Sequence, residues 1–143
     1  MATALVIVDV QNDYFPGGRF PLAGMEAAAQ NAGRALASAR DAGMAVFHVR
    51  HEIPSPGAPF FEPGTDGAEI HRLVTPEDGE PVVTKRFPNS FRSTDLEAQL
   101  RAADIDEVVV VGAQSNMCID ATARAAADLG FAVTVLHLSL IHI

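Results

Sequence analysis

The sequence predicts an α/β domain with a mostly parallel sheet, because β-branched runs alternate with alanine-rich stretches of helical length. The first run, ALVIVDV at residues 4–10, is almost continuously apolar, as in strands that are buried on both faces of a parallel sheet. The 143 residues suffice for one domain with a hydrophobic core, and no internal repeat or linker divides them. We therefore expect a three-layer α/β/α architecture.

The elements follow one another in a regular order. Strands are expected at residues 4–10, 45–50, 82–85, 108–111 and 132–136. Helices are expected at residues 26–42, 94–103 and 117–129, with a short helical candidate at 68–73. Thr94 and Glu97 have the spacing of a capping box and are expected to open the second helix, and Gly43 and Gly130 are expected to end the first and third. Loops rich in proline and glycine fill residues 11–22 and 51–81, and a loop as long as the second is usually functional or disordered.

Composition argues against several classes of protein. The chain has 10 basic and 18 acidic residues, a net charge of −8 and no basic cluster, which disfavours nucleic acid and anionic membranes as partners. The start, MATALVIVDVQND, lacks the basic region of a signal peptide, and no apolar run approaches membrane-spanning length. A single cysteine permits no internal disulfide, as is typical of a reducing compartment, so we expect a cytoplasmic protein.

Three reactive side chains follow predicted strands. Asp9 lies at the end of the first strand, Lys85 ends the third, and Cys118 falls just past the fourth, where a helix begins. The carboxyl ends of parallel strands meet at one edge of a sheet, so these side chains are expected to converge. The free N–H groups and dipole of a helix start favour a thiolate, Asp9 could accept the thiol proton, and Lys85 could keep both groups ionised. The structural alternatives are a core cysteine, a loop-capping carboxylate and a solvated lysine.

Further candidates surround these three positions. The turn at residues 112–116 offers backbone N–H groups for an oxyanion. The aromatic and methionine side chains nearby could line a substrate cleft or belong to the core, and the polar ones could orient a substrate. The candidate substrate-binding residues are Gln11, Phe15, Phe61, Asn89, Ser90, Phe91 and Met117.

Three segments in this order, VIVDVQNDY, VVTKRFPNSF and VVVVGAQSNMCIDATARAA, resemble the isochorismatase-like cysteine hydrolase superfamily. That superfamily includes nicotinamidases, carbamoylsarcosine-type and ureidoacrylate-type hydrolases, and isochorismatases. The resemblance covers residues 4–137 and implies a Rossmann-like fold with a catalytic triad of Asp9, Lys85 and Cys118. It also implies a non-proline cis peptide at Ala113–Gln114, which aims the N–H of Gln114, with that of Cys118, at the oxyanion. A homo-oligomer of the full-length form is a further implication.

Details within the superfamily narrow the reaction. The Asp-x-His metal motif of nicotinamidases is absent from residues 51–54, and His48, His51 and His71 lack the spacing of a metal site, so we expect no metal or cofactor. Many isochorismatases cleave a vinyl ether without the cysteine, so its presence favours cleavage of a C–N bond in a small amide or ureido substrate through a cysteine-linked acyl intermediate. The alternatives are isochorismatase-type ether hydrolysis and a noncatalytic binding or oligomerisation module. A nucleotide-binding domain is disfavoured because no G-x-G-x-x-G follows the first strand.

The last six residues suggest a separate origin. LSLIHI, residues 138–143, is what the codons CTG TCT CTT ATA CAC ATC encode, and these end a common transposase sequencing adaptor. We therefore expect an isochorismatase-like domain at residues 1–137 that is incomplete at its C-terminus and lacks its last strand and helix. An ordinary hydrophobic terminus is the alternative.

Overall fold

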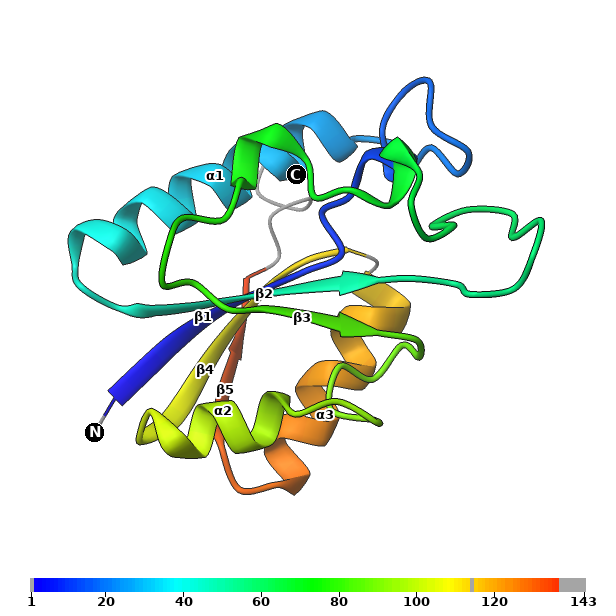
Figure 1. Cartoon of the computed structure of the whole chain (residues 1–143). Coiled ribbons are helices and arrows are strands. Elements are labelled where there is room, and N and C mark those ends of the chain that lie inside the picture. Colours follow the sequence, from blue (N-terminus) through cyan, green and yellow to red (C-terminus); the bar gives the residue numbers. More distant parts are fainter. Residues whose placement is uncertain (1, 114, 137–143) are drawn as a thin grey trace.

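Five strands form one parallel sheet in the computed structural model, which describes residues 2–113 and 115–136, without the side chains of Ser115 and Asn116. The strand order is β3-β2-β1-β4-β5. The strands are β1 (Ala2–Val8), β2 (Ala45–His51), β3 (Val82–Lys85), β4 (Ile105–Gly112) and β5 (Ala132–Val135). Helix α1 (Met25–Asp41) covers one face of the sheet, and α2 (Leu96–Ala102) and α3 (Asp120–Asp128) cover the other (Figure 1). The expected three-layer α/β/α class is confirmed.

The central strand β1 explains why its sequence is apolar at successive positions. Leu5 and Ile7 pack into the core beneath α1, whereas Ala4, Val6 and Val8 pack into the core that α2 and α3 cover. Side chains alternate between the two faces of a strand, and both faces are covered here.

Among the residues that the structure describes, none of the helices has the length and the apolar character that a membrane span requires.

Several element bounds differ from those expected. Strand β1 ends at Val8, because Asp9 adopts a left-handed backbone conformation with φ of 59°. The short helical candidate at 68–73 is replaced by two 3₁₀ turns, Asp66–Ala68 and Arg72–Val74. The helix expected at 117–129 begins with a π-helical turn, Ser115–Ile119, before α3. The first and third differences arise where the chain leaves the sheet edge, the second lies within the long loop, and periodicity in the sequence reports none of the three.

Gly112 sets the close approach of β4 to the end of β1. It pairs with Val8 and has φ of 133°, and a Cβ atom on it would lie 1.9 Å from the Val8 carbonyl oxygen. That same oxygen accepts a hydrogen bond of 3.0 Å from the N–H of Ala113. A glycine is therefore required where the chain leaves β4, shortly before Cys118.

Replacing this glycine should test that requirement. We expect Gly112→Ala to destabilise the protein by ~3 kcal/mol or more, because it combines a strained φ with a backbone clash. Gly130→Ala is the matched control, because Gly130 also has a positive φ of 95° but has open space where a Cβ atom would lie. Its cost should be about 1–2 kcal/mol. Urea unfolding measures both, and equal losses would contradict the role given to the Val8 contact.

Candidate active site

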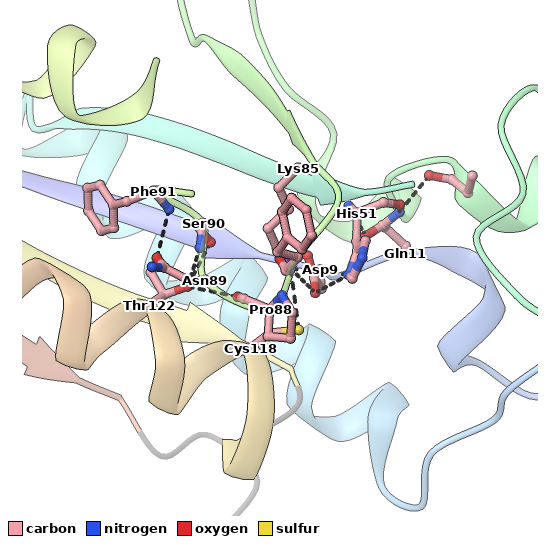
Figure 2. A network of polar contacts seen from close by, with 12 residues as sticks. Asp9, Gln11, His51, Lys85, Pro88, Asn89, Ser90, Phe91, Cys118 and Thr122 are labelled. Atoms are coloured by element: carbon pink, nitrogen blue, oxygen red, sulfur yellow. Dashed lines mark hydrogen bonds and ion pairs between the residues drawn. The ribbon is translucent and has the colours of Figure 1, made fainter. Parts of the chain in front are cut away.

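Asp9, Lys85 and Cys118 lie together at the carboxyl edge of the sheet (Figure 2). The Lys85 ammonium nitrogen is 3.1 Å from Oδ2 of Asp9 and 3.3 Å from Sγ of Cys118. Asp9 and Lys85 are 0% and 1% exposed, and Cys118 is also buried. A charge without a partner would be costly at such depth, so the ammonium and the carboxylate must be considered as one unit.

The backbone of Asp9 is strained at this edge. Its φ of 59° lies in the left-handed region, which a non-glycine residue rarely adopts. Its N–H still donates to the Val49 carbonyl of β2 at 2.9 Å. Strain of this kind costs on the order of 1 kcal/mol and is concentrated at functional sites.

His51 is a fourth member of the cluster. It ends β2 and pairs in register with Lys85 at the end of β3. Its Nδ1 lies 3.2 Å from the Lys85 ammonium and 3.8 Å from Oδ2 of Asp9. The sequence suggested His51 only as one of three possible metal ligands. Its position at the end of β2 could have indicated this, because β2 lies between β1 and β3, the strands that lead to Asp9 and Lys85.

The hydrogen bonds of the Lys85 ammonium go to three groups other than Asp9. The ammonium nitrogen contacts the carbonyl of Phe87 at 3.0 Å, Nδ1 of His51 at 3.2 Å and Sγ of Cys118 at 3.3 Å with hydrogen-bond geometry. Its contact with Oδ2 of Asp9, at 3.1 Å, is an ion pair. An ammonium group only donates, so Nδ1 of His51 is the acceptor and the ring hydrogen lies on Nε2.

The electrostatics of the cluster hold Cys118 as a thiol at rest. Burial raises the pKa of Cys118 to about 12, the Asp9 carboxylate contributes to this rise in pKa, and Lys85 opposes it only in part. The expectation that a helix start would favour a thiolate is therefore outweighed by burial and by the carboxylate. Burial, followed by the charge of Asp9, also raises the pKa of Tyr14, so its phenol keeps its proton. Catalysis at this site needs a base that removes the thiol proton.

The same side chains include a possible set of metal ligands. One carboxylate oxygen of Asp9, one ring nitrogen of His51 and Sγ of Cys118 lie within 4.8 Å of one another. However, the Lys85 ammonium is 3.1 to 3.3 Å from all three groups. A metal ion held by these three ligands would have to displace that fixed positive charge.

One of the predicted substrate-binding residues lies beside the cluster, and three others lie away from it. Phe61 is buried beside the cluster, with its ring centre 5.8 Å from that of His51, and Met117 is 51% exposed. Figure 2 shows Asn89, Ser90 and Phe91 displaced from the cluster toward Thr122 of α3. The Ser90 hydroxyl lies 2.7 Å from that of Thr122, and Asn89 Oδ1 accepts from the N–H of Phe91 at 2.9 Å.

Two further candidates have structural partners. Gln11 is fully buried, and its amide nitrogen donates to the carbonyls of His51 and Ala68, both at 2.8 Å. Its amide oxygen accepts from the His51 N–H at 2.9 Å, so Gln11 holds the end of β2 in place. Phe15 stacks on His71 with ring centres 3.7 Å apart, in the wall of a separate cleft of about 800 Å³ between residues 12–19 and 65–75.

Some expectations fall on residues that the structure does not describe. Ala113 is buried and its N–H donates to Val8, but Gln114 lies outside the described residues, and with it the expected cis peptide and oxyanion donor. Residues 138–143, the expected foreign tail, lie outside them as well. His48 is buried away from the cluster, with Nε2 2.8 Å from Glu80.

The family model, the similar sequences and the similar structures all point to the same family. The isochorismatase domain model matches residues 3–137. The isochorismatase family protein YddQ of Bacillus subtilis is 47% identical over 96% of this chain and 76% of its own length. Maleamate amidohydrolase of Pseudomonas putida is 33% identical over 94% of the chain and 70% of its own length. The crystal structure of an isochorismatase-type hydrolase from Oleispira antarctica superposes with a TM-score of 0.93 at 50% identity, covering 96% of this chain and 74% of that one.

The charge balance at Cys118 can be tested by titration. Asp9→Asn should lower the pKa of the thiol, because the carboxylate raises it, and Lys85→Met should raise it, because the ammonium lowers it. The ultraviolet absorbance of the thiolate reports the titration of the single cysteine, once the absorbance of the single tyrosine, followed at its own longer-wavelength band, is subtracted. Asp120→Asn removes the same charge from an exposed position on α3 and should leave the titration unchanged. An unchanged pKa in Asp9→Asn would show that the carboxylate does not face the thiol.

Proposed function

Because the chain belongs to the isochorismatase family and is a hydrolase, we propose that it cleaves a C–N bond of a small amide or ureido compound through an acyl group carried by Cys118. The observation that carries this proposal is the buried contact among a thiol, an ammonium and a carboxylate. Asp9, Lys85 and Cys118 are the catalytic residues in this proposal.

The first half of the reaction forms the acyl enzyme. As Sγ of Cys118 attacks the carbonyl carbon, the nearby carboxylate of Asp9 accepts the thiol proton. Lys85, at 3.3 Å from Sγ, stabilises the negative charge that develops on sulfur. Asp9 then gives the proton to the leaving nitrogen, the C–N bond breaks, and an amine or ammonia departs from a thioester.

The second half returns the enzyme to its resting state. Asp9 takes a proton from water, the resulting hydroxide attacks the thioester carbon, and the C–S bond breaks. The proton held on Asp9 returns to the sulfur, and a carboxylic or carbamic acid leaves. In both halves, the N–H groups of Gln114 and Cys118 are the proposed donors to the oxyanion.

The amide class is supported by the nucleophile and by a relative. A thiol at rest beside its base suits acyl transfer, in which sulfur forms a covalent intermediate. Maleamate amidohydrolase shares 33% identity with the chain over most of its length. We further propose a cytoplasmic homo-oligomer that needs no metal or cofactor, and its mass in solution is the direct measurement of assembly.

Turnover on a panel of substrates tests the proposal. Maleamate, other small amides and ureido acids should release ammonia or an amine, and Asp9→Asn and Cys118→Ser should each slow this release by about 10²-fold or more. Mass spectrometry of enzyme quenched during turnover should find the acyl group on the peptide that contains Cys118. Asp120→Asn serves as the control and should keep full activity.

Two outcomes would contradict the amide proposal. Hydrolysis of isochorismate at an equal rate by wild type and Cys118→Ser would indicate ether cleavage without the thiol. The absence of turnover and of an acyl adduct across the whole panel would indicate a noncatalytic module.

A further inference from the structure

We propose that His51 is a positioning residue that draws one N–H of Lys85 away from Asp9 and so keeps the Asp9 carboxylate free to accept the proton of Cys118. The inference rests on the proposed function, because it assigns Asp9 the role of base. It adds a residue outside the triad of Asp9, Lys85 and Cys118.

The first support is the number of acceptors around Lys85. Its ammonium group has three N–H bonds, and four possible acceptors lie within 3.3 Å of the nitrogen. The carbonyl of Phe87, Nδ1 of His51 and Sγ of Cys118 have hydrogen-bond geometry. Asp9, although its Oδ2 is only 3.1 Å away, has an ion pair alone.

The second support is that His51 is held firmly in this place. Its main chain is bonded on both sides to the buried amide of Gln11, at 2.8 and 2.9 Å. It lies opposite Lys85 in the β2–β3 register, and the ring of Phe61 packs beside it. The acceptor Nδ1 is therefore presented to Lys85 by the fold itself.

The consequence for Asp9 follows because His51 and Asp9 compete as acceptors for the N–H groups of Lys85. A hydrogen bond to the charged form of a carboxylate stabilises that form and makes it a weaker base. Without Nδ1, the free N–H of Lys85 would have Oδ2 of Asp9 as its nearest acceptor, at 3.1 Å. The groups that face Asp9 are Lys85 from β3, His51 from β2, Cys118 from the turn before α3, and Tyr14, whose raised pKa keeps it neutral.

Alkylation of Cys118 by iodoacetamide measures this proton transfer without a substrate. The thiolate sulfur displaces iodide, and the thiol proton remains on Asp9 or passes to water. In wild type, transfer to Asp9 should give a rate that is independent of pH near neutrality. In Asp9→Asn only water takes the proton, so the rate should fall about tenfold for each unit of pH toward acid.

Three variants of His51 separate its two ring nitrogens. His51→Ala removes Nδ1 and should lower the pH-independent rate about tenfold or more, as expected for one new hydrogen bond to a charged group. His51→Asn places an amide oxygen near the position of Nδ1 and should stay within about threefold of wild type. His51→Gln places its polar group near Nε2 instead and should behave like His51→Ala.

The outcomes distinguish this inference from the proposed function. If Asp9→Asn loses the pH-independent rate but His51→Ala retains it in full, His51 has no such role and the triad stands. If wild type itself has no pH-independent rate, proton transfer to Asp9 is refuted, and the proposed function with it. Rescue by His51→Gln and not by His51→Asn would overturn the role given to Nδ1. Should His51→Ala fail to fold, as thermal unfolding would reveal, the Asn and Gln pair decides the question.

Discussion

The buried ammonium of Lys85 is the constraint on which the site depends. It is 1% exposed at the end of a four-residue edge strand, where a lone positive charge would be expensive. Its stability therefore requires the Asp9 carboxylate at 3.1 Å and the acceptors supplied by β2, by the segment after β3 and by the turn before α3. The strand order, with β1 between β2 and β4, is what brings these segments to one point.

The architecture could be predicted from the sequence because burial leaves a pattern that can be recognised. The run of residues 4–8 is apolar at successive positions because two cores lie on either side of β1. The end of that strand could not be predicted, because the left-handed conformation of Asp9 arises from the packing around it, and no glycine or proline marks it. Gly112 is the opposite case: its lack of a side chain is required by the Val8 carbonyl, a contact between strands that are distant in sequence.

The candidate site was predictable only in part, for a related reason. Positions at strand ends placed Asp9, Lys85 and Cys118 near one another, and the structure brings them into contact. His51 was missed as their neighbour because its role depends on the pairing of β2 with β3. Ser90 and Phe91 follow Lys85 closely in sequence, yet Ser90 bonds to Thr122 and Phe91 packs near Phe131. The resting thiol was not foreseen, because burial is a property of the fold as a whole.

A double-mutant cycle on Lys85 and Asp9 measures whether these two buried charges stabilise the protein as one unit. Urea unfolding of Lys85→Met, Asp9→Asn and the double variant gives the coupling energy. Each single change should cost about 3–5 kcal/mol, because it leaves an uncompensated buried charge. The double change should cost far less than the sum, with a coupling of ~2 kcal/mol or more. Additive costs would show that the charges are independent and would contradict the account.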